Sequence, residues 1–418
     1  MRSEATLTKA PEKAGAPNLV IAFDTWALSD RFRHQGIAIY ARKLLEAFQK
    51  LVPLQEGLAI RAFVDPGNSL GATEFRASPG FELVRAGLLR RNQLWRSVGI
   101  TTAALKSHAD LIFCPHGQSF SLGVVPVVTT IHDVTPIRSA SHSVYMNSLL
   151  RASFRISATF SRKILTDSEC SKRDLLEIYK LPPEKVKVVH LGYDRETFNS
   201  VPADPTQQKA LLDRFGIRTP FILHHGTVQP RKNLERLIHA YRLLLERRSD
   251  LDLQLVLAGQ LGWQYEPILR AAKETGRSGE VVLTGALPDE ELASLVKGAA
   301  LCVVPSLYEG FCLPMVEAMA CGVPTIAANT SCLPEVSGGV LCYFDPLSVE
   351  DISKTIEHVL NDSALRDELA RNGVKRAAEF SWERCARETL DFLLATHAER
   401  TGKSLRVLER KPEMSGRT

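Results

Sequence analysis

The chain of 418 residues contains no pair of cysteines in a C-x-x-C spacing. Its eight cysteines are scattered, which argues against a zinc site and against a disulfide framework. Three of them stand in apolar, strand-like runs: Cys114, Cys302 and Cys342. We predict that these three are reduced core residues.

Long apolar runs are also absent, and none approaches the roughly 18 residues that a membrane-spanning helix needs. Residues 1–17 mix charged and small residues without an apolar centre. We interpret them as a disordered lead-in rather than an export signal. These features favour a cytoplasmic protein, and they leave peripheral contact with the inner face of the cell membrane as an open alternative.

Charge of one sign is not in large excess. The net charge is +5, and no basic stripe with interleaved aromatic residues occurs, which argues against nucleic acid as a partner. One short basic segment alternates with apolar residues and contains Arg85, Arg90, Arg91 and Arg96. On a helix it would suit an anionic membrane surface, but an ordinary surface helix with its apolar side on the core is the favoured reading.

The composition, 44% hydrophobic and 24% charged, is typical of a globular protein too long for one ordinary core. Short apolar runs alternate with helical segments, and the alternation restarts near Phe221, with helices expected near 234–247, 266–274 and 290–297. This pattern is typical of parallel sheets covered on both faces. We therefore predict an α/β protein with two Rossmann-like domains facing a central cleft, where ligands bind at the carboxyl ends of the strands.

Composition also predicts the domain boundaries. The expected units are a first domain at 18–200, a linker at 201–219, a second domain at 220–380, a helix at 381–400 and a disordered tail at 401–418. The linker assignment rests on polar residues with Pro202 and Pro205. Ser381 suits the N-cap of the last helix. Two linked domains would permit closure around a ligand, which excludes water.

The most informative stretch is PSLYEGFCLPMVEAMACGVPTIAANTSCLP, at 305–334. It sets Glu309 before a helix and Glu317 within its first turn, since Pro314 is a favoured first helical residue. The amides just before that turn, where a helix end favours an anion, belong to Phe311, Cys312 and Leu313. This arrangement suits a ligand with hydroxyls at both ends and phosphate between them, such as a nucleotide-sugar. The spacing alone would also fit a glutamate that complements a helix dipole.

The whole string resembles the glutamate-x7-glutamate segment of retaining glycosyltransferases of family four, including the EGF-LP-EAMA-G-P core. The resemblance covers about residues 18–396. It implies the GT-B fold, with the last helix crossing back onto the first domain. It also implies that Glu317 holds the ribose hydroxyls of a nucleotide-sugar and that Glu309 contacts the donor sugar. Cys312 stands where many relatives have glycine.

A second segment, Val228-Gln229-Pro230-Arg231-Lys232-Asn233, matches the family's RKN element. An arginine fork and a lysine point charge can together neutralise a leaving diphosphate, although such a pair read alone is usually a solvated surface. Thr227 stands where some relatives carry a second arginine, so Arg231 or a first-domain arginine would have to compensate. The donor-side residues implied by the resemblance are Gly226, Arg231, Lys232, Leu287, Glu309, Gly310, Phe311, Cys312, Leu313 and Glu317.

In the first domain, TIHDVTP at 130–136 is similar to the family motif whose histidine faces the donor sugar. A lone histidine is more often structural, but the resemblance makes His132 a candidate catalytic residue together with Arg231, Lys232 and Glu309. Three residues are expected on the acceptor side: Gly36, His116 and Asp133. Gly36 opens GIAIY where relatives often show GIGRY, so acceptor recognition departs most from the family.

Asp250-Leu251-Asp252 looks like the metal-binding D-x-D of other glycosyltransferases. It precedes a strand at its amino end, away from the expected cleft, so we interpret it as a solvated turn. We expect no metal ion and no other cofactor, the nucleotide-sugar being a substrate.

TIHDVTP and EGF-LP-EAMA together look most like the bacterial branch that includes mannosyltransferases of surface polysaccharide assembly. The resemblance implies mannosyl transfer from GDP-mannose to a saccharide or lipid-linked saccharide acceptor. A UDP- or dTDP-sugar donor remains open, as does a protein that binds a nucleotide-sugar without catalysis. A nucleotide-sugar epimerase of the same fold is a further alternative, although such epimerases lack the glutamate-x7-glutamate string.

Overall fold

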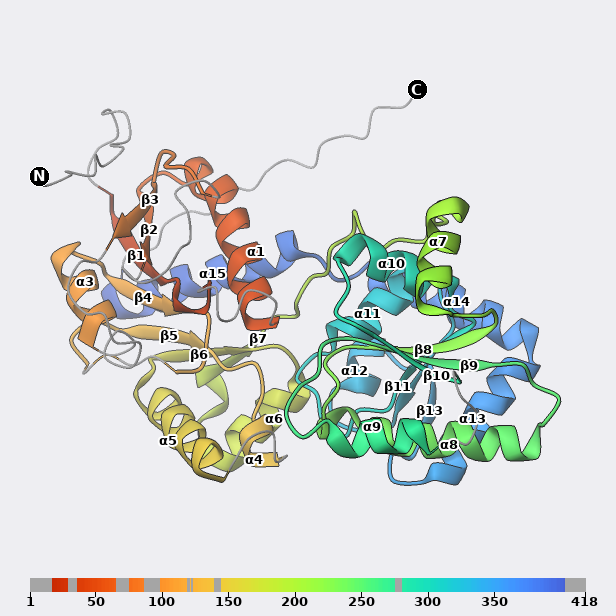
Figure 1. Cartoon of the computed structure of the whole chain (residues 1–418). Helices are drawn as coiled ribbons and strands as arrows, with labels where there is room; N and C mark the ends of the chain where they lie inside the picture. The colour runs from red at the N-terminus through yellow and green to blue at the C-terminus, as the bar shows by residue number, and fades with distance from the viewer. Residues whose placement is uncertain are drawn as a thin grey trace, which may run out of the picture.

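The structure is a computed structural model that describes residues 17–28, 36–64, 75–85, 98–118, 121, 123–138, 144–274 and 280–402. These residues form two lobes, each with a sheet between layers of helices (Figure 1). The first sheet has the strand order β3-β2-β1-β4-β5-β6-β7, and the second has the order β10-β9-β8-β11-β12-β13. All pairings within these two sheets are parallel, so the predicted two-domain α/β architecture is confirmed.

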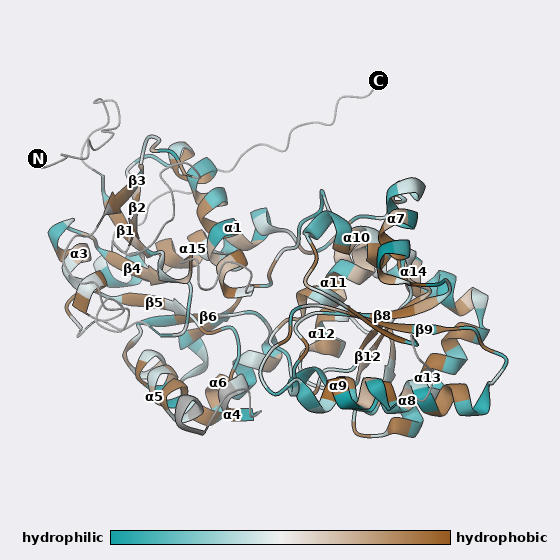
Figure 2. Ribbon diagram, in the orientation of Figure 1, coloured by the Kyte–Doolittle hydropathy of each residue, from teal (hydrophilic) through white to brown (hydrophobic). Residues whose placement is uncertain are grey.

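The first sheet is built from β1 Leu19–Asp24, β2 Leu58–Val64, β3 Phe81–Arg85, β4 Leu111–Cys114, β5 Val127–Thr130, β6 Lys163–Thr166 and β7 Val186–Val188. Its helices are α1 Gly36–Leu51, α3 Ile100–Lys106, α4 Thr135–Arg138, α5 Val144–Phe160 and α6 Glu169–Tyr179. Strand β1 is buried along its whole length because helices cover both faces of the sheet. The hydropathy colouring shows the same apolar strands between helices with polar outer faces (Figure 2).

The second sheet is built from β8 Phe221–His225, β9 Gln254–Ala258, β10 Val281–Gly285, β11 Leu301–Val304, β12 Thr325–Ala328 and β13 Cys342–Phe344. Its helices are α7 Pro205–Phe215, α8 Leu234–Arg247, α9 Glu266–Lys273, α10 Asp289–Gly298, α11 Leu313–Ala320, α12 Leu333–Ser337, α13 Val349–Asn361 and α14 Ser363–Ala377. The helices expected near 234–247, 266–274 and 290–297 are confirmed as α8, α9 and α10. Each follows a strand end, which brings the connecting loops to one edge of the sheet.

The segment 201–219, expected as a linker, contains a helix, α7, at Pro205–Phe215. Asp204 accepts a hydrogen bond from the amide of Gln207 at 2.8 Å, and Pro205 occupies the first turn of α7. Proline is favoured there because its missing N–H would be unpaired anyway. Gln208 donates to the carbonyl oxygen of Ser294 in α10 at 2.8 Å, so α7 packs on the second domain.

The two segments that cross between the domains lie side by side. Arg195, after β7, donates from Nη2 to the carbonyl oxygens of Ala378 and Phe380 at 2.6 and 2.8 Å. A Cβ added to Gly192 would stand 2.0 Å from the backbone nitrogen of Trp382. Only glycine permits this close approach of two backbones, which ties the two crossings together.

Helix α15, Trp382–Thr401, leaves the second domain and packs on α1 of the first (Figure 1). The side chain of Ser381 accepts a hydrogen bond from the amide of Arg384 at 3.1 Å, which confirms the predicted N-cap. Glu399 pairs with Lys163 of β6 at 3.1 Å. The return of the last helix to the first domain is therefore confirmed.

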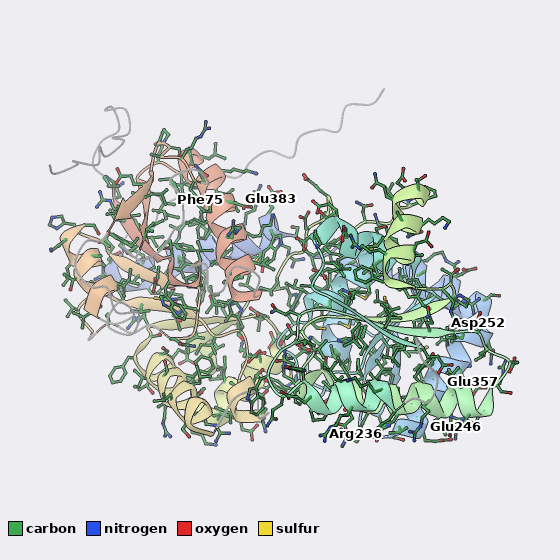
Figure 3. The ribbon with its side chains drawn as sticks, viewed as in Figure 1. Phe75, Arg236, Glu246, Asp252, Glu357 and Glu383 are labelled. Atoms are coloured by element: carbon green, nitrogen blue, oxygen red, sulfur yellow. The ribbon has the colours of Figure 1, made fainter. Side chains whose placement is uncertain are left out.

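The structure also bears on the basic segment, on membrane-spanning helices and on the D-x-D sequence. Of the basic segment, only Arg85, at the end of β3, belongs to the described residues. The rest of the segment falls within 86–97, which lies outside the described ranges. None of the helices in the described part of the chain is both long enough and apolar enough to cross a membrane. Asp250 pairs with Arg248 at 2.9 Å, and Asp252 lies in the turn before β9, at the edge of the second lobe away from the first (Figure 3). The D-x-D sequence is therefore a surface turn, as predicted.

Candidate active site

Helix α11 begins at Leu313, with Pro314 in its first turn, so the helix expected in the glutamate-x7-glutamate segment is confirmed. Glu309 lies in the loop between β11 and α11, and Glu317 lies one turn inside the helix. Cys312 precedes the helix with a φ of 73° in the left-handed region, which non-glycine residues rarely adopt. A glycine at this position would fit the backbone without strain.

The N-terminus of α11 presents the backbone donors that the sequence predicts. Within the described part of the chain, the amides of Phe311, Cys312 and Leu313 donate no hydrogen bond. The Cys312 side chain points into the core and is 5% exposed. Burial raises the pKa of its thiol to about 12, so the thiol is uncharged at neutral pH.

Glu309 lies between the two cations of the RKN element. Its carboxylate is 2.5 Å from Nη1 of Arg231 and 2.7 Å from Nζ of Lys232. Burial alone would raise the pKa of Glu309, but the attraction of Arg231 and Lys232 outweighs it and holds this pKa at about 2. The three charged side chains form one buried cluster at the carboxyl ends of β8 and β11.

The loop after β8 explains how Arg231 and Lys232 reach this place. Gly226 has a φ of 132°, and a Cβ on Gly259 would stand 2.0 Å from its carbonyl oxygen, so the loops after β8 and β9 touch. Arg231 Nη1 also donates to the carbonyl oxygen of Tyr308 at 2.6 Å. Asn233, with a φ of 58°, donates to the carbonyl oxygen of Pro346 at 2.7 Å. The first bond holds the RKN element against the loop that carries Glu309, and the second ties it to the loop after β13.

Glu317 has a partner that the sequence reading missed. Nε2 of His225 lies 3.2 Å from the Glu317 carboxylate. His225 is the last residue of β8, directly before Gly226. The available signal was a polar residue at the carboxyl end of a buried strand, the position where α/β sheets place ligand-binding residues.

His132 is held in the first domain by a second residue that the sequence reading missed. Its Nδ1 lies 2.8 Å from Oδ2 of Asp167, which follows β6, and the Tyr40 ring packs edge-on at 4.7 Å. Burial lowers the pKa of His132, but the charge and hydrogen bond of Asp167, together with the charge of Asp133 and the carbonyl oxygen of Pro115, outweigh it and raise this pKa. Asp167 therefore fixes the imidazole and favours its protonated form.

The two predicted motifs meet across the interface between the domains. A Cβ on Gly310 would stand 2.6 Å from the carbonyl oxygen of His132 and 3.0 Å from Cβ of Asp133. Nearby, the Tyr308 hydroxyl donates to Asp174 of α6 at 2.7 Å. The loop that carries Glu309 therefore touches the loop that carries His132, as an active site between two domains requires.

Three further predicted residues, His116, Gly36 and Leu287, lie outside the cluster of charged side chains. His116 is 1% exposed, and its Nε2 lies 3.0 Å from Oδ2 of Asp24, so it is a core residue of the first domain and lines no acceptor surface in this structure. The prediction missed this because Asp24, its buried partner, is 92 residues away in sequence. Gly36 opens α1 with no neighbour within 4 Å of an added Cβ. Leu287, half-buried, follows β10 at the edge of the sheet.

The site thus combines two cations, helix-start amides and two carboxylates on the second domain, and the loop that carries these groups touches the loop of His132. Cations and helix-start amides are groups that bind diphosphates in proteins, and carboxylates accept hydrogen bonds from hydroxyls.

Comparison with known proteins agrees with this chemistry. Residues 35–197 match the family model Glycosyltransferase Family 4, and residues 213–376 match Glycosyl transferases group 1. The chain is 33% identical over 306 residues to O-antigen chain mannosyltransferase B of Escherichia coli, covering 72% of this chain and 76% of that protein. It is 32% identical over 294 residues to the serotype-specific mannosyltransferase WbdA of Escherichia coli, covering 65% of this chain but only 34% of that longer protein.

The fold comparison covers more of the molecule. Sucrose-phosphate synthase from Thermosynechococcus elongatus matches with a TM-score of 0.68 at 21% identity, over 91% of this chain and 100% of that chain. This likeness shows the two-domain GT-B architecture. The chain therefore belongs to the group 1 and family 4 glycosyltransferases.

Proposed function

We propose that the protein transfers mannose from GDP-mannose to a saccharide or lipid-linked saccharide acceptor, with retention, in polysaccharide or glycoconjugate synthesis. The observation that carries this proposal is the buried cluster of Arg231, Lys232 and Glu309 beside the start of α11, on a loop that touches the backbone of His132. The names of the Escherichia coli relatives support mannose as the sugar. A lipid-linked acceptor would place the reaction at the cytoplasmic face of the membrane.

The cluster suits the leaving group of this reaction. Glu309 pairs with both Arg231 and Lys232, and a nucleoside diphosphate would bring further negative charge to these two cations. The unpaired amides before α11 add donors that need no reorganisation when the bond to the sugar breaks. We infer that these groups supply the charge stabilisation and that the reaction requires no metal ion.

Glu317 and Glu309 would then take the two ends of the donor. Glu317, oriented by His225, would accept hydrogen bonds from the ribose hydroxyls. Glu309, still paired with Arg231 and Lys232, would accept hydrogen bonds from hydroxyls of the mannose. His132, oriented by Asp167, would contact the same sugar from the first domain.

The charge state of Glu309 bears on how retention is achieved. A double displacement needs a carboxylate free to attack the anomeric carbon. With its pKa held at about 2 by two cations, Glu309 is a weak nucleophile. We therefore assign retention to same-face attack, in which the departing phosphate oxygen takes the proton of the acceptor hydroxyl.

Thermal unfolding with GDP, UDP and dTDP, followed by the matching mannosyl and glucosyl donors, tests the proposal. We expect GDP and GDP-mannose to raise the Tm selectively, and Glu317→Gln to remove most of that shift. Selective stabilisation by UDP or dTDP would instead favour the alternative donors. If GDP-mannose binds but no GDP is released with any saccharide acceptor, the non-catalytic binding protein becomes the better reading.

A further inference from the structure

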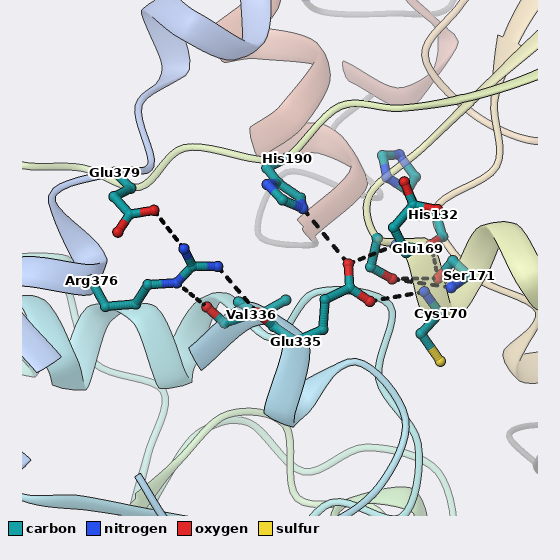
Figure 4. A network of polar contacts seen from close by, with 10 residues as sticks. His132, Glu169, Cys170, Ser171, His190, Glu335, Val336, Arg376 and Glu379 are labelled. Atoms are coloured by element: carbon teal, nitrogen blue, oxygen red, sulfur yellow. Dashed lines mark hydrogen bonds and ion pairs between the residues drawn. The ribbon is translucent and has the colours of Figure 1, made fainter. Parts of the chain in front are cut away.

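We propose that Glu335 is a positioning residue for the transfer reaction: it bridges the second domain to the N-terminus of α6 and so places His132 opposite Glu309. The inference rests on the proposed function for the role of His132, but the bridge itself is a property of the structure. Figure 4 shows the network around this carboxylate.

The bridge consists of two hydrogen bonds across the domain interface. The backbone amides of Glu169 and Cys170 donate to the two carboxylate oxygens of Glu335 at 2.7 and 2.9 Å. These are the first two amides of α6, which have no partner within the helix and carry the positive end of its dipole. A carboxylate with both oxygens engaged is well matched to that position.

A third group lies beside the bridge. Nε2 of His190, on the chain between β7 and the second domain, lies 3.7 Å from Oε1 of Glu335. Burial raises the pKa of Glu335, but His190 and the two amides outweigh it and lower the pKa below its usual value. Glu335 is therefore ionised at neutral pH and attracts both the α6 terminus and His190.

On its own domain, Glu335 is firmly anchored. Arg376 of α14 donates to the carbonyl oxygens of Glu335 and Val336 at 3.1 and 2.8 Å. The loop just before α12 also reaches the donor site, because the amide of Glu309 donates to Oγ of Ser331 at 3.1 Å. The segment that presents Glu335 thus also supports Glu309.

On the first domain, the turn that Glu335 binds is the one that holds His132. Asp167 binds the imidazole, and Oγ of Ser171 donates to the carbonyl oxygen of His132 at 3.1 Å. Ser168, the N-cap of α6, accepts from the Ser171 amide at 3.1 Å and fixes this turn. The first turn of α6 therefore binds Glu335 through its backbone amides and His132 through a side chain.

These contacts form a continuous connection from Glu309 through Ser331 and Glu335 to the first turn of α6, and from there to His132. Breaking it would leave the donor-binding groups of the second domain intact while His132 loses its place relative to them. Incomplete closure would also admit water to the bound donor.

The first test is kinetic and uses the full chain with GDP-mannose and a mannosyl acceptor. Glu335→Gln keeps the shape but removes the charge and one of the two acceptor oxygens. We expect kcat to fall about tenfold or more. The KM for GDP-mannose should stay within about twofold, and donor hydrolysis should rise relative to transfer, because donor contacts persist while closure is lost.

A matched control is Glu379→Gln, which removes the same charge from a residue that pairs with Arg376 but does not touch α6. Its kcat should equal that of the unmodified chain. Glu335→Asp provides a second variant: its shorter side chain keeps the charge, so it should retain more activity than Glu335→Gln. An unchanged kcat in Glu335→Gln, or a raised KM with unchanged kcat, would overturn the proposal.

A second test needs no substrate and separates this inference from the proposed function. Small-angle X-ray scattering should give a larger radius of gyration for Glu335→Gln than for the unmodified chain and for Glu379→Gln. Equal radii would contradict the bridge whatever the donor proves to be. Failure of GDP-mannose to bind, with an enlarged Glu335→Gln, would overturn the assigned donor but not the bridge.

Discussion

Gly310 of the second domain lies directly against the backbone of His132 in the first. A Cβ at position 310 would stand 2.6 Å from the carbonyl oxygen of His132, a separation that real Cβ atoms do not tolerate. The obstacle is backbone rather than the end of a flexible side chain, so it cannot turn aside. We therefore expect Gly310→Ala to hold the two domains apart and to lower kcat/KM by at least about tenfold, with the Tm little changed.

Gly298→Ala is the matched control for this prediction. At the end of α10, an added Cβ would meet the side-chain amide of Gln208 at 3.1 Å, and that side chain can move. The control should keep its activity. A Gly310→Ala chain as active as the control would show that the observed contact between the two loops is not needed for catalysis.

His225→Ala should weaken binding of the nucleoside diphosphate. His225 is 4% exposed and orients the Glu317 carboxylate, so without it Glu317 loses its fixed position for the ribose. We expect a fall in GDP affinity of roughly threefold to tenfold, which corresponds to about one hydrogen bond. Isothermal titration calorimetry measures it directly.

His358→Ala is the control, because His358 is exposed on α13. Affinity for inorganic diphosphate should change little in either variant, since Arg231 and Lys232 remain. If His225→Ala binds GDP as the unmodified chain does, Glu317 needs no support from β8.

Local patterns explain which parts of the site could be predicted from the sequence. The alternation of strands and helices placed α8, and the motif string placed Glu309, Glu317, Arg231 and Lys232 near one edge of the sheet. Each of these inferences needs only neighbours within one strand–loop–helix unit. The helix start at Leu313 follows from the local preference of Pro314 for a first turn.

The missed residues act through partners that are distant in sequence. Asp167 is 35 positions from His132, His225 is 92 from Glu317, and Glu335 is 165 from the amide of Cys170. Nothing in the local pattern around these residues names its partner. Helix α7 was missed because a local signal was misinterpreted. Pro202 and Pro205 were taken as signs of a linker, although Pro205 begins the helix.

Cys312 offers a test of backbone strain beside the amides proposed to bind the diphosphate. Its φ of 73° costs a non-glycine residue about 1–2 kcal/mol, which glycine does not lose. Comparing Cys312→Gly with Cys312→Ala cancels the loss of the buried side chain. We expect the glycine variant to be more stable by about 1 kcal/mol in urea unfolding. Equal stability of the two variants would mean that the loop relaxes when the thiol is removed.

The last prediction concerns the acid stability of the Arg231–Lys232–Glu309 cluster. The pKa of Glu309 lies at about 2 in the folded chain, below the value of 4.5 of a free glutamate. A carboxyl whose pKa is depressed by folding binds more protons when unfolded, so its contribution to stability is present above pH 4.5 and is lost as the pH falls toward 2. Glu309→Gln removes that contribution. The difference in unfolding free energy between the unmodified chain and Glu309→Gln should therefore be constant above about pH 5 and shrink progressively below it. Urea unfolding at a series of pH values measures this difference, with Glu383→Gln as an exposed control that should show no such trend. A difference that does not change between pH 5 and the lowest pH at which the protein folds would mean that Glu309 is not held ionised by its two cations.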